Sequence, residues 1–125
     1  MPLGARPRVA YRDGVSGLGR GGREQAVWTR VSPVAGQPLD LLHARVLDDF
    51  APHVHEPFAI GACTEGTEAI GYRGRVHYSR PGSLVILEPG EPHTGGPAQP
   101  AGFVYRVMYP SAELLADGAG CCSPR

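Results

Sequence analysis

The sequence has no lysine, no net charge and no long apolar run, and each absence narrows the classes of protein to consider. The twelve basic residues are all arginine and are balanced by twelve acidic residues. The broad cationic field that draws proteins onto nucleic acid or anionic membranes is therefore missing. No apolar segment approaches the roughly 18 residues that a membrane-spanning helix needs, and the N-terminus lacks the apolar core of a secretory signal. We expect a cytoplasmic protein that does not contact a membrane.

Cysteine is also scarce, with three residues in the chain. Cys63 stands alone in an apolar run, while Cys121 and Cys122 are adjacent in a polar tail. This arrangement is neither a disulfide framework nor the Cys-x-x-Cys spacing of metal and redox sites. We expect Cys63 to be a buried thiol without a redox role.

A length of 125 residues suits one domain, which would bury roughly two thirds of the surface that its unfolded chain exposes. Glycine and arginine dominate the first 26 residues, a composition that cannot bury enough apolar surface to offset its ordering entropy. We expect a flexible arm over residues 1–26, a folded domain over residues 27–116 and a disordered tail over residues 117–125.

Within the domain, short runs with strand-like alternation are separated by turn residues, a pattern typical of β-sandwiches and β-barrels. The fold class is therefore all-β, an antiparallel β-barrel. The predicted strands are Leu39–Val46, Phe58–Thr64, Glu68–Tyr72, Val76–Tyr78, Ser83–Leu87 and Phe103–Tyr109.

Turn and cap residues support these boundaries. Gly66, Gly74, Gly82 and Gly90 follow the predicted strands or their Pro-containing turns, at positions where a positive φ is expected. One short C-terminal helix is expected over residues 111–116, with Ser111 as its N-cap and Gly118 as its end.

Two histidines lie two residues apart and a third follows a rigid turn. On a strand, His53 and His55 would point to the same side, and His93 follows the turn Pro89-Gly90-Glu91-Pro92. Small residues continue the same face, because the two-residue parity adds Ala59, Gly61 and Cys63. Small side chains leave volume inside a barrel, and a cavity with a few polar groups is the usual form of a small-molecule site.

Aromatic residues add two candidates to this site. Tyr72 and Tyr105 carry phenol groups that would suit a polyol if they reach the cavity. The predicted ligand-binding residues are His53, His55, Tyr72, His93 and Tyr105. For each histidine the alternative is a structural role, with the imidazole bonded to a nearby carbonyl.

At this point the sequence resembles a known superfamily. The string His53-Val54-His55-Glu56, followed by the segment from Gly82 to His93, resembles the two half-motifs of cupins. The order "PHVHEPFAIG", "GYRGRVHYSRPGSLVILEPGEPHTG" and "GFVYRVMYP" is similar to the N-terminal effector-binding domain of AraC-type transcription regulators. The resemblance covers about Trp28 to Leu115. It implies a cupin-like jelly-roll barrel that senses a small effector, often a sugar or another metabolite, without catalysing a reaction.

The resemblance also implies helices that this sequence does not contain. In AraC-type regulators a dimerisation helix and two helix-turn-helix motifs follow the barrel, whereas here a polar segment follows Leu115. We expect no direct DNA binding by this chain alone. One hypothesis is that the chain is a truncated product of a longer regulator. A homodimer, if formed, would depend mainly on strands and the arm.

Two alternatives stay open. In a small metal-dependent cupin enzyme, His53, His55 and His93 would bind zinc, iron, manganese or nickel, and Glu56 or Glu91 would transfer protons. The carboxylate that enzymatic cupins place four or five residues after His-x-His is absent here, because that position falls on Ala59 or Ile60. We therefore expect no cofactor, although three histidines can hold a metal. In the other alternative, the protein's own side chains fill the barrel and nothing binds.

Overall fold

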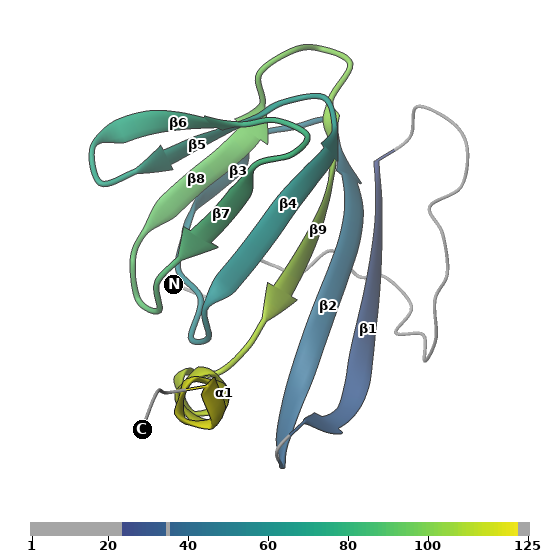
Figure 1. The fold of residues 1–125 in the computed structure, drawn as a ribbon. Helices are drawn as coiled ribbons and strands as arrows, with labels where there is room; N and C mark the ends of the chain where they lie inside the picture. The colour runs from purple at the N-terminus through teal and green to yellow at the C-terminus, as the bar shows by residue number, and fades with distance from the viewer. Residues whose placement is uncertain (1–23, 35, 123–125) are drawn as a thin grey trace.

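Two antiparallel sheets face each other in the computed structural model, which describes residues 24–34 and 36–122 (Figure 1). Residues 1–23 of the predicted arm and residues 123–125 of the predicted tail lie outside the described residues. In the described part, the strands are β1 (Gln25–Val34), β2 (Gln37–Val46), β3 (Phe50–His53), β4 (Ala59–Glu65), β5 (Glu68–Tyr72), β6 (Arg75–Ser79), β7 (Leu84–Leu87), β8 (His93–Pro97) and β9 (Phe103–Tyr109). One helix, α1 (Ala112–Cys122), follows them. It is too short to cross a membrane, and no other helix occurs in the described residues.

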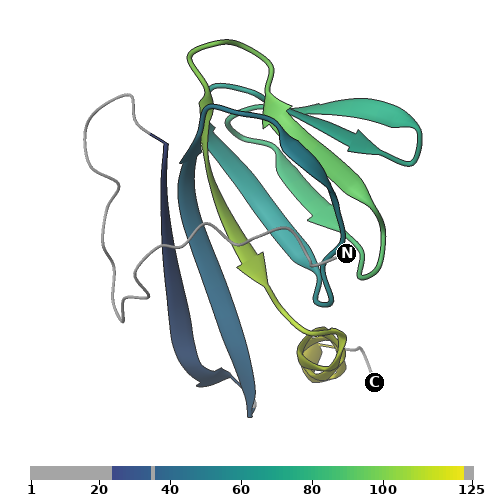
Figure 2. The ribbon, with the colours of Figure 1, turned by 180° about the vertical axis from the view of Figure 1, so that it is seen from behind.

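The larger sheet has the strand order β1-β2-β9-β4-β7 and the smaller sheet has the order β3-β8-β5-β6. Figure 2 shows the two sheets from behind, splayed apart at one end. No strand of one sheet pairs with a strand of the other among the described residues. The predicted all-β, antiparallel fold is confirmed, but backbone hydrogen bonds do not close the barrel.

Alternation along the strands places the core between the two sheets. In β2, Leu42, Ala44 and Val46 are buried, whereas the residues between them are less buried. Phe103 and Val107 of β9 belong to the same buried cluster. Trp28 of β1 and Ala59 and Cys63 of β4 complete this side of the core. Burial of Cys63 confirms the expectation of a buried thiol.

The turns follow the glycine pattern of the sequence. Gly66, Gly74, Gly82 and Gly90 all have positive φ angles, between 71° and 93°, as expected. Arg73, which precedes Gly74 between β5 and β6, also has a positive φ of 51°. Two successive residues with positive φ are typical of the tightest hairpin turns, whose twist matches that of the strands.

Three strands were not predicted correctly. β1 begins at Gln25, so strand structure starts within the segment predicted as arm. β8 was not predicted at all, and β3 was expected only as a strand that carries both His53 and His55, whereas it ends at His53. β8 has the sequence His-Thr-Gly-Gly-Pro, which has little intrinsic β-propensity, and it is a strand because β3 and β5 pair with it on either side.

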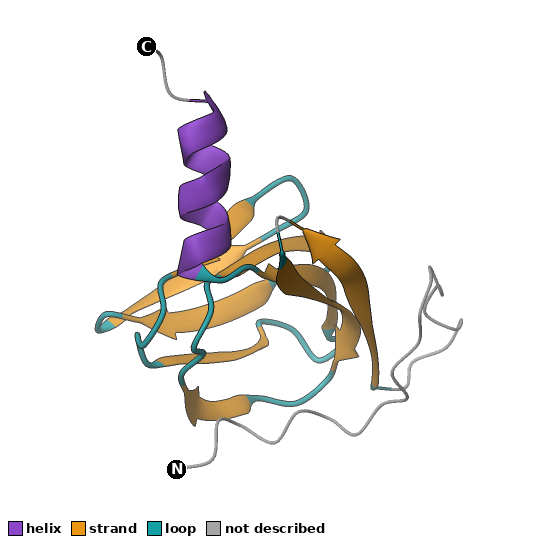
Figure 3. Ribbon diagram, turned by 90° about the horizontal axis from the view of Figure 1, so that it is seen from below, coloured by secondary structure: helices purple, strands orange, loops and turns teal. Residues whose placement is uncertain are grey.

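The C-terminal helix starts as expected and ends later. The amide of Leu114 donates to the hydroxyl oxygen of Ser111 at 3.0 Å, which confirms the predicted N-cap. The predicted end at Gly118 is wrong, because α1 continues to Cys122. Figure 3 shows this helix projecting away from the sheets. Residues 117–122, predicted as disordered tail, are therefore helical.

Candidate functional site

A cavity of about 670 Å³ lies between the two sheets. Residues of β1, β2, β4, β7 and β9 line it on one side, and residues of β3, β5 and β8 line it on the other. The cavity contains four of the five predicted ligand-binding residues, His53, His55, His93 and Tyr105. Tyr72 is outside the lining; its ring lies under the guanidinium of Arg73, 5.0 Å from that group's central carbon.

The three histidines come together at one end of the cavity. The ring centroids of His53 and His93 are 4.3 Å apart, and that of His55 lies 4.8 Å from the first and 5.1 Å from the second. One nitrogen from each ring lies within 4.8 Å of the others. His53 and His93 are register partners across β3 and β8. The prediction that the three imidazoles converge is confirmed.

His55 reaches this cluster by a different route from the one expected. The expectation placed His53 and His55 on one strand, but β3 ends at His53. Instead, the amide of Gly90 donates to the carbonyl of His55 at 3.0 Å. This bond ties the loop that carries His55 to the Pro-Gly turn that precedes His93, so the two histidine-bearing segments are held side by side.

Hydrogen bonds fix the tautomers of two histidines. His53 Nδ1 lies 2.8 Å from the carbonyl oxygen of Ala51, and His93 Nδ1 lies 3.3 Å from that of Glu91. Because a carbonyl oxygen only accepts, Nδ1 must carry a proton in each ring, and Nε2 of a neutral ring then has a free lone pair. Burial also lowers the pKa of His93. His93 is therefore neutral at physiological pH, with Nε2 as an acceptor or metal ligand.

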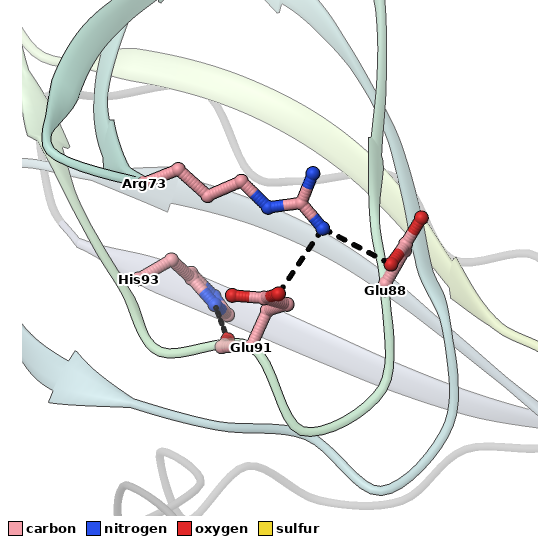
Figure 4. A network of polar contacts seen from close by, with 4 residues as sticks. All are labelled: Arg73, Glu88, Glu91 and His93. Carbon is pink, nitrogen blue, oxygen red and sulfur yellow. Dashed lines mark hydrogen bonds and ion pairs between the residues drawn. The ribbon is translucent and has the colours of Figure 1, made fainter.

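The turn that carries His93 is held from outside the cavity by Arg73. Its guanidinium nitrogen lies 3.2 Å from a carboxylate oxygen of Glu88 and 3.1 Å from one of Glu91 (Figure 4). Glu91 thus bonds to Arg73 through its side chain and to His93 through its carbonyl. The contact links the β5–β6 turn to the β7–β8 connection, although its half-exposed ion pairs are screened by solvent.

Small residues of β4 form part of the cavity wall. The alternation of side chains predicted three of them on this face, and two of the three line the cavity. Ala59 and Gly61 line the cavity, whereas Cys63 is buried in the core beyond it. A Cβ added to Gly61 would meet a methyl carbon of Val107 at 3.4 Å. The lack of side-chain bulk on β4 therefore leaves the volume open.

Aromatic rings line much of the remaining wall, and sequence reasoning missed most of them. Trp28 stacks on Tyr109 with centroids 5.4 Å apart, and Tyr109 lies 5.1 Å from His55. Phe50 stacks on Tyr105 at 6.5 Å. Their inward positions on β1, β3 and β9 could have been found from alternation once those strands were assigned.

Glu68, the first residue of β5, is the polar residue of the site that sequence reasoning missed entirely. It is 9% exposed, lines the cavity, and has its pKa raised to about 7 by burial. Burial also raises the pKa of Tyr105. The enzyme hypothesis named Glu56 and Glu91 as proton carriers, but neither is both buried and in the cavity lining, as Glu68 is. Glu56 lines the cavity but is exposed, and Glu91 is outside the lining.

The comparisons with known proteins agree with this architecture. A family model described as the AraC-like ligand binding domain matches residues 36–120, close to the span over which the sequence showed the resemblance. None of the curated proteins matches the chain.

Several solved structures are similar in fold. A cupin 2 conserved barrel domain protein from Salinispora arenicola CNS-205 has a TM-score of 0.61 at 18% identity, over 88% of this chain and 98% of that chain. A cupin-2 domain containing protein from Shewanella frigidimarina NCIMB 400 has a TM-score of 0.56 at 14% identity, over 74% and 84%. A cupin-like protein from Thermotoga maritima MSB8 has a TM-score of 0.54 at 20% identity, over 61% and 59%. At these identities the likeness concerns the fold. With the family match over most of its length, the chain belongs to the AraC-like ligand binding domains and has a cupin fold.

Proposed function

We propose that the chain senses a small organic effector, a sugar or another metabolite, as part of an AraC-type system of transcription regulation. The observation that carries this proposal is the cavity of about 670 Å³ between the sheets, lined by aromatic rings at its walls and three histidines at one end. A volume of this size is within the range of small-molecule sites.

The chemistry of the lining suits a ligand with an apolar face and hydroxyl groups. Trp28, Tyr109 and Phe50 offer ring surfaces on which such a face can pack. In their neutral form, the rings of His53 and His93 can accept a hydrogen bond from a hydroxyl group at Nε2, because Nδ1 carries the proton that bonds to a carbonyl. In this proposal the site holds its ligand without turnover, and binding stabilises the folded state.

The proposal separates sensing from DNA binding. The described residues contain one helix, α1, and no helix-turn-helix. A DNA-binding element would therefore act from another chain or another part of the regulator, and the β-domain would report on the effector.

A thermal-shift screen of sugars and small metabolites on the full chain tests the proposal. We expect at least one compound to raise the melting temperature of the wild type in a concentration-dependent way. Leu87→Trp should abolish the shift, because Leu87 lines the cavity. Ile86→Trp is the matched control, since Ile86 is the adjacent residue on β7 but is exposed outside the cavity. No stabilising compound, or equal shifts in both variants, would contradict the proposal.

The histidine cluster favours a second candidate, a divalent metal centre. Three imidazoles are a donor set that zinc and related metals accept, and the bonds from Nδ1 of His53 and His93 to carbonyls are the outer contacts typical of metal-binding histidines. Two nitrogens on one tetrahedral zinc ion are about 3.4 Å apart, so the present separations of up to 4.8 Å would have to shorten by more than an ångström. A metal here would act as a Lewis acid toward a bound ligand.

Metal analysis separates the two candidates. A metal centre predicts stoichiometric metal in the purified protein that is lost in His55→Ala. An effector site without metal predicts that a metabolite still raises the protein's melting temperature after a chelator has removed any metal.

A further inference from the structure

We propose that the effector carries a positively charged nitrogen, such as an amine or guanidine group, and that Glu68 binds it. The inference rests on the proposed small-molecule function and narrows its ligand to a cationic class. It comes from an acidic group at the cavity wall that the fold buries and leaves without a counter-ion.

The geometry around Glu68 shows that the fold makes room for this carboxylate. Gly95 lies on the neighbouring strand β8, diagonally across from Glu68, whose own register partner is Pro97. A Cβ at Gly95 would lie 2.8 Å from Oε2 of Glu68 and 2.9 Å from Cδ2 of Phe50. The carboxylate and the Phe50 ring therefore both pack over a bare backbone position at the wall of the cavity.

Glu68 has no hydrogen bond or ion pair from its carboxylate within the described residues. A buried carboxylate without a partner is unfavourable, and proteins usually pair or neutralise it. Burial is the single cause of its raised pKa, with no contribution from a neighbouring cation. A ligand cation is the partner that the site lacks.

The rest of the cavity also favours a cation over an anion. Its lining holds four carboxyl groups, Glu24, Asp49, Glu56 and Glu68, against one guanidinium, that of Arg45. Arg45 lies 3.7 Å from the carboxylate of Glu65, which offsets its charge. Tyr105, whose phenol has its pKa raised by burial and further by the nearby Tyr109 and Glu68, remains neutral near this carboxylate.

The aromatic rings around Glu68 are compatible with a cationic group. Phe50 packs over the same glycine, and Tyr105 stacks on Phe50. Ring faces attract cations, so an ammonium group held by Glu68 would lie among favourable neighbours while the apolar body of the ligand packs on the other rings. The histidines at the other end would bind the ligand's hydroxyl groups.

Two matched ligand series test the inference: 2-phenylethylamine, 2-phenylethanol and phenylacetate, and pentylamine, 1-pentanol and hexanoate. Dissociation constants of the full chain are measured at pH 8 by calorimetry or ligand-observed NMR. In at least one series we expect the dissociation constant of the amine to be at least about tenfold lower than that of the alcohol, because a hydrogen bond to a charged group is stronger than one between neutral groups. The carboxylate should bind least tightly.

Variants of Glu68 test whether this residue causes the preference for the amine over the alcohol. Glu68→Gln should reduce the affinity for the amine to that for the alcohol, and Glu68→Asp, which keeps the charge, should retain the preference. Glu113→Gln is the control, because Glu113 is exposed on α1 and outside the cavity. Circular dichroism verifies that each variant is folded.

Failure of this inference can be distinguished from failure of the proposed function. Alcohols or carboxylates that bind as well as amines, or an amine preference that survives in Glu68→Gln, would overturn the cationic ligand and leave the small-molecule site intact. If neither these compounds nor any member of the metabolite screen binds, both proposals fail.

Discussion

Glu68 lies at a position where the sheet leaves it little contact with water, and its protonation should therefore affect stability. Its pKa is raised from 4.5 to about 7 in the folded state by burial. The folded state thus binds this proton more tightly than the unfolded state, and the resulting stability is lost as pH rises from about 4.5 through about 7.

Glu68→Gln removes this titration and should stabilise the protein at high pH. We expect the variant to gain about 3 kcal/mol over the wild type at pH 8 and much less at pH 5, measured by urea denaturation at both values. Glu113→Gln should show no pH-dependent gain. An equal effect of Glu68→Gln at pH 5 and pH 8 would contradict the burial of this carboxyl.

Gly95 tests the packing of Glu68 from the opposite strand. Gly95→Ala should destabilise the fold by about 1–3 kcal/mol, because the added Cβ would meet both Glu68 and Phe50 within 3 Å. Gly61→Ala is the control, since its nearest contact is an ordinary 3.4 Å to Val107. Thermal unfolding measures the stability of both variants. Equal stability would show that a Cβ at Gly95 does not collide with Glu68 and Phe50.

Sequence reasoning found the histidines of the site and missed its acid. The short spacing of His53 and His55 and the rigid turn before His93 mark all three in the sequence. Glu68 begins a strand, and a charged residue there is usually exposed. It is buried because β5 lies between β8 and β6, a placement that strand order determines and local sequence does not.

At the scale of elements, the start of α1 depends on one side chain. Ser111→Ala removes the oxygen that accepts from the Leu114 amide and should destabilise the protein by about 1 kcal/mol. Thermal unfolding followed by circular dichroism checks this. Ser83→Ala, at an exposed turn position, should have little effect, and equal losses would argue against the cap.

The contact of Arg73 with Glu88 and Glu91 should hold the turn before His93. Arg73→Asn tolerates the positive φ and removes both ion pairs. We expect faster hydrogen exchange at the Gly90 amide, which bonds to His55, and little change in the melting temperature. Arg75→Asn, on the exposed side of the same turn, is the control. Unchanged exchange in Arg73→Asn would mean that the turn is held by its backbone alone.

Element prediction succeeded where local signals agreed and failed where neighbouring strands decided. The glycine turns and the Ser111 cap follow from local chemistry. β8 depends on its two partner strands, and α1 continues through Gly118 because the roughly 1 kcal/mol penalty of a helical glycine does not by itself end a helix.

For the whole molecule, the sequence predicted the fold class and the presence of a cavity, but not the size of that cavity. Small residues at Ala59 and Gly61 indicated unfilled space. The separation of the two sheets, and hence the volume of about 670 Å³, depends on twist and bulges that periodicity does not reveal. A homodimer stays a prediction, which light scattering can check.

We expect the space between the sheets to bind a small organic molecule. NMR chemical-shift mapping of the wild-type chain with a compound from the thermal-shift screen can locate this binding. We predict the largest shifts at the rings of His53, His55 and His93 and at the methyl groups of Ala59 and Val107, all of which line the cavity. Shifts concentrated at Leu84 and Ile86, exposed on the outer side of β7, with none at the cavity residues, would contradict the claim.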